Sequence, residues 1–98
     1  MDERRILQGI VFAWHTDKAH SNRRKHGIDL ATACEAFFDP FLVVLDNEIV
    51  DDELRGALLG LTKAWRLLYV VYALRNDTFR LISARPATSA ERRMYENQ

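Results

Sequence analysis

The 98-residue sequence predicts one α+β domain, in which an antiparallel sheet of about four to five strands carries two N-terminal helices and one C-terminal helix packed on one face. Three observations predict this class. Two N-terminal segments have helical patterns, the second with apolar residues at helical spacing. Three strand-like runs follow with short linkers, and a helix-capping motif precedes the last residues. The length allows one modest core, so residues 1–98 are expected to form a single domain.

A strand and a helix are expected first. Residues 1–9 read as an N-terminal extension that is partly mobile, and residues 10–14 read as a short strand. The helical pattern begins at Thr16 or Asp17 and continues to His26. Gly27 suits the left-handed residue that follows a helix, so this helix is expected to end there.

A second helix is expected over residues 29–38, with Asp29 as its N-cap and Pro40 as its stop signal. Its apolar side chains are spaced to form one stripe, and they are Leu30, Cys34, Phe37 and Phe38. Cys34 is the only cysteine, so it is expected to be a buried apolar residue and not a reactive thiol.

Four strands are expected next. Residues 41–45 form the first, and residues 46–52 read as an acidic loop. Linkers of two and three residues separate the three runs that follow, which predicts an antiparallel meander of residues 54–62, 65–74 and 78–85. Gly56 and Gly60 weaken the first of these runs.

A terminal helix is expected to begin after Thr88. The segment Thr88-Ser89-Ala90-Glu91 has the form of a capping box, in which the first and fourth residues satisfy each other's backbone amides. The helix that follows would carry Arg92, Arg93 and Tyr95.

Charge is unevenly distributed along a chain whose 14 basic and 14 acidic residues balance. Residues 29–54 contain eight acidic and no basic side chains, whereas residues 55–93 contain eight basic and two acidic ones. Cations also dominate residues 21–27, so a fold that brings this segment to residues 83–96 would create a local anion site. Net neutrality argues against a protein that coats nucleic acid over its whole surface.

No spacing of Cys and His suggests a metal site, so neither a metal nor another cofactor is expected. The first residues are too charged and too short in apolar content for a signal peptide or a membrane span. A cytoplasmic protein without membrane contact is therefore expected.

Ten short motifs, in order and nearly without gaps, cover the chain from Phe12 onward. They are Phe12-Ala13-Trp14, Lys18, Ser21-Asn22-x-x-Lys25-His26-Gly27, Phe38-Asp39-Pro40, Glu53-x-Arg55, Gly60-Leu61-Thr62, Leu68-Tyr69-Val70-Val71-Tyr72, Arg80-Leu81-Ile82-Ser83-Ala84-Arg85, Ala87-Thr88 and Glu91-Arg92-Arg93-x-Tyr95-Glu96. In these motifs the sequence resembles the BrnT family.

That resemblance implies the toxin half of a type II toxin-antitoxin system. It implies a small ribonuclease with a RelE/ParE-like fold, which cleaves RNA, free or on the ribosome, and thereby arrests translation. It also implies a BrnA-type antitoxin, whose ribbon-helix-helix domain binds operator DNA, so that the toxin would contact DNA only through this partner.

Three positions depart from the family pattern. The segment before Arg55 lacks the usual His, Leu74 stands where Glu is usual, and Pro86 replaces a common Arg. Lost polar groups at these positions would weaken activity more than they would change the fold.

Metal-free RNA cleavage requires a base, an acid and a cation on the phosphate. Arg55 and Arg85 are the expected cations, because a guanidinium stays charged and holds two phosphate oxygens at once. Arg55 starts one expected strand and Arg85 ends another, so the two are expected to share a rim. The alternative is that both pair with the acidic residues around Asp51. Arginines on opposite sides of the molecule, or each paired with its own carboxylate, would end the expectation of one shared site.

His26 is the expected proton carrier, since histidine as a residue type exchanges protons near neutral pH. Lys25 is expected beside it, although both residues would equally stabilise a helix C-terminus. Glu53 is a candidate base or a solvated carboxylate, and Ser83 a candidate phosphate or ribose contact.

The remaining expected contacts to RNA are Arg24, Arg80, Arg92 and Tyr95, and the ring of Tyr95 would alternatively pack on the sheet. Glu91 is expected to serve the helix cap, and His15 and His20 to be solvated. Trp14 and Trp65 suit core or partner contacts better than base stacking. The rival function is a non-catalytic antitoxin partner within a DNA-binding repressor complex.

Overall fold

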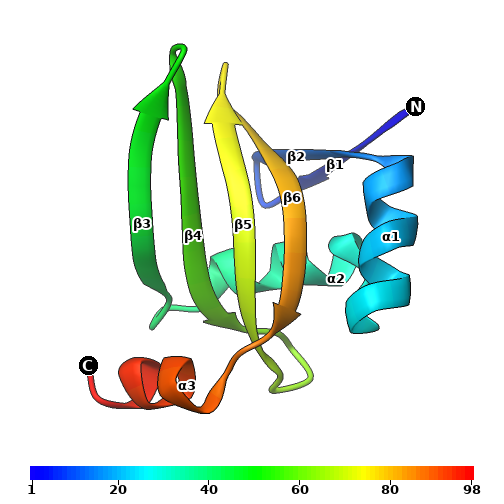
Figure 1. Cartoon of the computed structure of the whole chain (residues 1–98). Helices are drawn as coiled ribbons and strands as arrows, with labels where there is room; N and C mark the ends of the chain where they lie inside the picture. The colour runs from blue at the N-terminus through cyan, green and yellow to red at the C-terminus, as the bar shows by residue number, and fades with distance from the viewer.

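The computed structural model describes all 98 residues and contains a six-stranded sheet with strand order β1-β2-β6-β5-β4-β3 (Figure 1). Its elements, in chain order, are β1 (Asp2–Leu7), β2 (Ile10–His15), α1 (Thr16–His26), α2 (Leu30–Ala33), the 3₁₀ helix η1 (Cys34–Phe38), β3 (Val43–Val50), β4 (Glu53–Leu61), β5 (Leu67–Arg75), β6 (Thr78–Pro86) and α3 (Ser89–Glu96). The α+β class is confirmed, but the sheet has more strands than expected.

The first nine residues are not an extension, and that expectation is wrong. β1 pairs antiparallel with the whole of β2 through a tight turn at Gln8 and Gly9, where both residues have positive φ. β2 then pairs in parallel with the start of β6, from Val11 opposite Thr78 to Ala13 opposite Arg80. The sheet is therefore mixed and not purely antiparallel, so the expected RelE/ParE-like sheet of four to five strands is not matched in detail.

The antiparallel meander is confirmed, since β3, β4, β5 and β6 are neighbours in order. The expectation of an acidic loop at residues 46–52 is wrong, because β3 continues to Val50 and only Asp51 and Asp52 form the turn. β3 is an edge strand, and edge strands tolerate charged side chains because one side of the strand faces water.

The helix α1 has the expected bounds, and the amide of Gly27 closes it by donating to the Arg23 carbonyl. The expected second helix is divided into one α-helical turn, α2, followed by the 3₁₀ helix η1. Asp29 stands at the N-cap position but makes no capping hydrogen bond with its side chain.

One face of the sheet packs against α2 and η1 and forms the core. Phe12 lies at its centre, with its ring centroid 5.0 Å from that of Phe37 and 5.9 Å from that of Phe79. Gly60 of β4 permits close contact with η1, because a Cβ there would lie 2.4 Å from the Ala36 carbonyl oxygen. The glycine that weakened the strand prediction is therefore required for packing.

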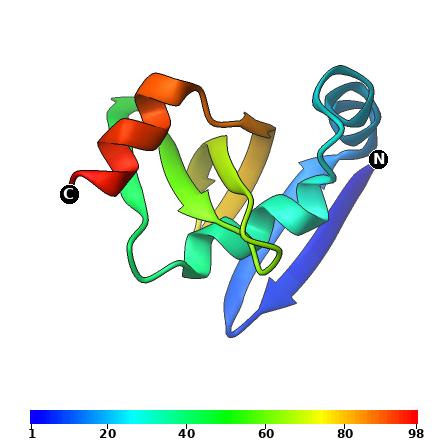
Figure 2. The same ribbon diagram turned by 90° about the horizontal axis from the view of Figure 1, so that it is seen from below.

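The expectation that all three helices cover one face is wrong. η1 lies behind β4 and β5 in Figure 1, and the view from below shows α3 on the opposite side of these strands (Figure 2). No residue of α3 is buried. Hydrogen bonds from Tyr95 to Asp39 and from Gln98 to the Phe41 carbonyl hold the helix near the end of η1. None of the three helices combines the length and apolar character that a membrane-crossing helix requires.

Candidate functional site

The face of the sheet opposite η1, here called the open face, carries the expected functional side chains that belong to β4 and β6. Residues alternate between faces along a strand, and Leu58 and Gly60 belong to the core face, so Arg55, Ala57 and Leu59 belong to the open one. The pairing register extends these into three rows across β4, β5 and β6, which are Arg55–Ala73–Arg80, Ala57–Val71–Ser83 and Leu59–Tyr69–Arg85.

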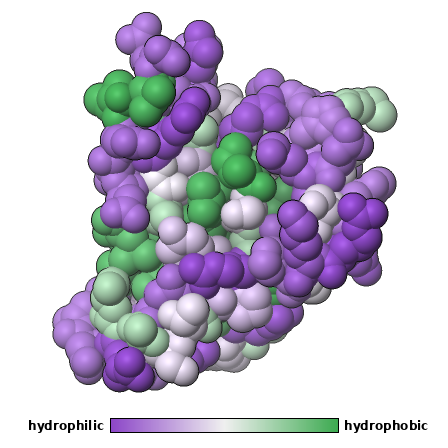
Figure 3. Space-filling model, viewed as in Figure 1, coloured by the Kyte–Doolittle hydropathy of each residue, from purple (hydrophilic) through white to green (hydrophobic).

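Small side chains occupy the middle of the open face. Ala57, Ala73 and Ser83 are short side chains, and Ala57 and Ala73 are buried beneath their neighbours, whereas arginines stand at the two ends of the grid. Figure 3 shows apolar surface in the centre of this face and polar surface around it. An apolar floor with a cationic margin is suited to a ligand that has both flat apolar parts and negative charge.

The shared rim expected for Arg55 and Arg85 is wrong. β4 and β6 both run antiparallel to β5, so they run in the same direction, and the start of β4 lies at the opposite end of the sheet from the end of β6. Arg55 shares its row with Arg80, at roughly 10 Å between their Cα atoms for two strand spacings. Arg85 lies two rows away, beside Tyr69.

The two basic segments nevertheless meet at the Arg85 end. The Asn22 side chain of α1 accepts from the Ala84 amide at 2.9 Å and donates to the Ala84 carbonyl at 2.9 Å, as a neighbouring strand would. It also donates to the Ile28 carbonyl at 2.9 Å. α1 and β6 run in the same direction in Figure 1, so the last turn of α1, with Lys25 and His26, lies alongside the end of β6.

Arg85 is held by Glu91 of α3. Its Nη1 and Nη2 atoms donate to the two Glu91 carboxylate oxygens at 2.8 and 2.9 Å, and the guanidinium carbon lies 4.1 Å from the centre of the Tyr69 ring. The hydrogen bond to Arg85 lowers the pKa of Glu91 despite partial burial, and the same bond raises the pKa of Arg85. Glu91 also forms the expected capping box with Thr88.

The other two open-face arginines also have carboxylate partners. Arg55 pairs with Glu53 at 3.0 Å, and Arg80 pairs with Asp2 of β1. The alternative that Arg55 pairs with the acidic segment before it is therefore correct in part. The side chains of Arg55 and Arg80 remain 54% and 41% exposed, and exposed ion pairs of this kind contribute about 0–1 kcal/mol. A phosphate can therefore compete for both guanidinium groups.

Arg85 keeps free hydrogen-bonding capacity. Its Nη1 donates to Glu91 and to the Pro86 carbonyl, and its Nη2 donates to Glu91. A guanidinium has five N–H donors, so Nε and one donor of Nη2 stay available. Arg24, Lys25 and Arg92 are exposed and form no ion pair.

Several expected residues have structural roles. Tyr95 donates its hydroxyl to Asp39, and burial together with this bond raises the pKa of Tyr95 to about 12. His15 is not simply solvated, because its Nδ1 accepts from the Asp17 amide and caps α1. Cys34 is buried, as expected, and burial raises the pKa of its thiol to about 12.

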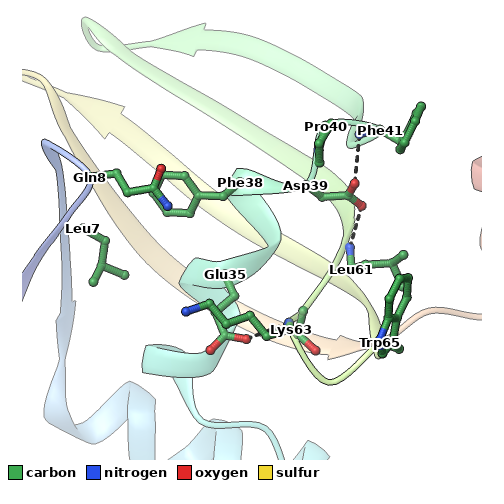
Figure 4. Close-up of a pocket in the computed structure, with 11 residues that line it drawn as sticks. Leu7, Gln8, Glu35, Phe38, Asp39, Pro40, Phe41, Leu61, Lys63 and Trp65 are labelled. Atoms are coloured by element: carbon green, nitrogen blue, oxygen red, sulfur yellow. Dashed lines mark hydrogen bonds between the residues drawn. The ribbon is translucent and has the colours of Figure 1, made fainter.

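The two tryptophans differ. Trp14 is a core residue with 2% exposure, as expected, whereas Trp65 is 80% exposed. Trp65 lines a cavity of about 560 Å³ at the end of η1, together with Leu7, Phe38 and Phe41 (Figure 4). None of the expected catalytic side chains lines this cavity, so it is separate from the open-face site.

Three residues that support the site were not singled out as candidates from the sequence. Asn22 joins the two basic segments, and Tyr69 packs its ring against Arg85. Asp39 accepts hydrogen bonds from the Leu61 amide and the Tyr95 hydroxyl; burial opposes ionisation, but these bonds hold the pKa of Asp39 below its usual value. All three lie within the sequence motifs that resemble the BrnT family, and this position was the sequence signal that could have identified them. No group of three or more His, Cys, Asp and Glu is arranged to bind a metal ion.

Comparisons with known proteins support a specific family. A family model described as the ribonuclease toxin BrnT of type II toxin-antitoxin systems matches residues 14–91. The crystal structure of the Brucella abortus ribonuclease toxin BrnT has a similar fold, with a TM-score of 0.59 and 24% identity over 78% of this chain and 94% of that one. A search of the curated proteins found no match.

Proposed function

The chain belongs to the BrnT family of ribonuclease toxins of type II toxin-antitoxin systems, and on this premise we propose that it is a metal-independent endoribonuclease that arrests translation by cleaving RNA. Membership of a type II system implies an antitoxin partner and an RNA substrate. The observation that supports the proposal for this chain is the junction of α1 and β6, where Asn22 bonds to Ala84, the residue between Ser83 and Arg85. The last turn of α1, which includes Lys25 and His26, runs beside the end of β6 at this junction (Figure 1).

The chemistry proposed at this junction is transesterification. The ribose 2'-oxygen forms a bond to phosphorus, the bond from phosphorus to the 5'-oxygen breaks, and the products are a 2',3'-cyclic phosphate and a 5'-hydroxyl. His26 and Lys25 carry out the two proton transfers: one proton is removed from the 2'-hydroxyl, and one is given to the leaving 5'-oxygen. Arg85 stabilises the charge on the phosphate, and Ser83 donates its hydroxyl to a phosphate or ribose oxygen.

The other end of the open face is proposed to bind the RNA strand away from the scissile bond. Arg55 and Arg80 share a row there, and each would exchange its carboxylate partner for a phosphate. Glu53 is thereby assigned to holding Arg55 and not to proton transfer. Arg24 and Arg92, which have no acidic partners, would add phosphate contacts around Arg85.

The antitoxin is proposed to be of the BrnA type, with a ribbon-helix-helix domain that carries the complex to operator DNA. This toxin would then contact DNA only through the antitoxin, and the complex would act in the cytoplasm. The family match alone supports this proposal.

The test uses the purified full-length chain and a short labelled RNA in a buffer containing EDTA. We expect cleavage that EDTA does not reduce, products ending in a 2',3'-cyclic phosphate, and no cleavage where the 2'-hydroxyl next to the cleaved bond is replaced by hydrogen. In cells, induction of the chain alone should stop growth with RNA breakdown, and co-expression of the antitoxin should restore growth. Loss of cleavage in EDTA, or cleavage of the 2'-deoxy substrate, would contradict the mechanism.

One observation favours the rival function, a non-catalytic antitoxin partner in a repressor complex. Arg55, Arg80 and Arg85 each have a carboxylate partner, and the Glu91 pair of Arg85 is bidentate and only partly exposed. If induction of the chain leaves growth and RNA intact while the chain still binds its antitoxin, the rival function holds.

A further inference from the structure

A second, smaller cavity lies on the open face between Arg55 and Tyr69. Its volume is about 510 Å³, and it extends from the exposed edge strand β3 across β4 to β5. Ala57 and Val71 form part of its lining, and Asp46 and Glu48 of β3 stand on one side of it. The cavity therefore combines a flat apolar floor with two carboxylates.

The two carboxylates have no partner within the chain. Glu48 lies directly opposite Arg55 in the β3–β4 register, yet the Arg55 guanidinium bonds to Glu53 instead. The carboxylates of Asp46 and Glu48 form no ion pair and accept no hydrogen bond from a side chain or a backbone amide. Their oxygens are free to accept hydrogen bonds from a ligand.

The chemistry of this cavity fits one nucleobase best. Single-stranded RNA is read by stacking of bases on aromatic rings and by hydrogen bonds to their Watson–Crick edges. An ionised carboxylate only accepts hydrogen bonds, and its two oxygens are best matched by a base with two adjacent N–H donors. Guanine presents such a pair at N1 and N2, whereas adenine, cytosine and uracil each place an acceptor beside their donor.

From these observations we propose that the cavity is a guanine-binding subsite, in which Asp46 or Glu48 accepts from N1–H and N2–H and the ring of Tyr69 forms a wall for the base. This inference rests on the proposed ribonuclease function and adds a specificity to it. Tyr69 connects the two sites, because its ring lines the cavity and also contacts the Arg85 guanidinium.

The charges of the open face favour one orientation of the RNA, with its backbone at Arg85 and its base toward β3. The unpaired acids stand on β3, and the cations of the proposed cleavage site stand on β6 and α1, roughly 14 Å away for three strand spacings. Asp46 and Glu48 repel a phosphate from the β3 side of the cavity, whereas the uncharged base faces no such repulsion. Arg55, at the other side of the cavity, is left for a phosphate farther along the RNA. The backbone is thus kept at Arg85 while the base reaches toward β3.

The test compares the double variant Asp46→Asn, Glu48→Gln with a control of equal charge change, Asp51→Asn, Asp52→Asn, at the tip of the same hairpin. The substrates are short RNAs that differ only in carrying guanine, inosine or adenine beside the cleaved bond, because inosine lacks the N2 amino group. We expect the native chain and the control to prefer guanine by at least about tenfold over adenine, with inosine between them. The double variant should lose this preference and cleave the guanine and adenine substrates at similar rates.

Binding of 2'-O-methyl versions of these RNAs, followed by fluorescence anisotropy, makes the test independent of cleavage. A guanine preference in binding that disappears in the double variant supports the subsite even if the chain does not cleave RNA. A preference that survives in the double variant, or no preference in the native chain, overturns it. If the double variant instead loses affinity for the antitoxin with base preference unaltered, β3 is an antitoxin surface and the subsite is also overturned.

Discussion

The two faces of the sheet are built from neighbouring residues of the same strands but differ in what they carry. On the core face, Phe12 and Phe79 pack with η1, and Gly60 allows the helix to touch the strand. On the open face, the same strands present small side chains in the centre and Arg55 and Arg85 at the ends. Most of the buried core therefore lies on one face and the groups suited to RNA on the other, where Leu59 and Leu67 are nevertheless buried as well.

The separation has a physical consequence for mutation. Burial of apolar surface is the main favourable contribution to folding, whereas exposed ion pairs contribute little. Substitutions on the core face should thus change unfolding, and substitutions on the open face should change cleavage with small effects on unfolding. Each prediction below tests whether the two faces are separate in this way.

The largest effect on stability is expected for Phe12→Ala, which removes the ring at the centre of the core. Loss of a buried aromatic ring costs about 3–5 kcal/mol. The matched open-face variant is Val71→Ala, whose side chain is only half-buried and which should cost about 1 kcal/mol. Urea unfolding of both variants gives the comparison, and equal losses would show that the open face is also a core.

The second prediction is that Arg85→Ala lowers RNA cleavage on the order of a hundredfold, because a cation that stabilises the transition state contributes about 3 kcal/mol. Its stability should fall by about 1 kcal/mol at most and its antitoxin binding should persist. Arg85→Lys keeps the charge without the fork and should retain an intermediate rate. Arg93→Ala, an exposed arginine without an ion pair, is the control. Full activity of Arg85→Ala would remove this residue from the site.

Third, Asn22→Ala should destabilise the protein by about 2–3 kcal/mol, because it leaves the buried Ala84 amide and carbonyl unsatisfied. Cleavage should fall as well, since α1 would no longer be fixed to β6. The neighbouring variant Ser21→Ala serves as the control in the same unfolding and cleavage assays. Unchanged stability of Asn22→Ala would mean that another contact joins the two basic segments.

Fourth, Tyr95→Phe should cost about 1 kcal/mol, because it removes the hydroxyl bond to Asp39 while the ring remains. The loss should be local to α3, which has no buried residue of its own. Hydrogen exchange should therefore become faster over residues 89–96 and stay unchanged in β5. A uniform increase over the whole chain would contradict this local role.

The smallest effect is a loss of stability in acid. The Arg85 hydrogen bond holds the pKa of Glu91 below its ordinary value of 4.5. A carboxyl group with a lowered pKa in the folded state stabilises the fold above its unfolded pKa and loses this contribution as pH falls through the folded one. Stability should thus be constant above about pH 5 and fall below pH 4.5, with a shallower fall in Glu91→Gln. An identical acid profile for this variant would contradict the role of the pair.

Local signals in the sequence predicted much of the fold. Gly27 marked the end of α1, the Thr88–Glu91 capping box marked the start of α3, and short linkers predicted the meander. β1 was missed because its charged residues suggested a mobile extension, although Gln8-Gly9 between two apolar runs is a hairpin signal. The parallel pairing of β2 with β6 joins residues far apart in the chain, and no local pattern encodes it.

The candidate site was predicted in part. The meeting of the two basic segments was expected, but Asn22, which produces it, was not identified because its partner Ala84 lies 62 residues away. The predicted meander alone makes β4 and β6 run in the same direction, so it already places Arg55 and Arg85 at opposite ends of the sheet. The pairing of Arg85 with Glu91 depends on where α3 turns back, which the capping motif does not specify.

The most direct test of the account is to observe which face of the sheet RNA contacts. Val70 and Val71 are adjacent in β5, and Val70 is fully buried in the core whereas Val71 lies on the open face. Methyl NMR spectra recorded during titration with a 2'-O-methyl RNA separate the two. The account predicts that the Val71 signals shift while those of Val70 stay in place. Shifts confined to Val70, or to residues at the cavity beside Trp65, would contradict it.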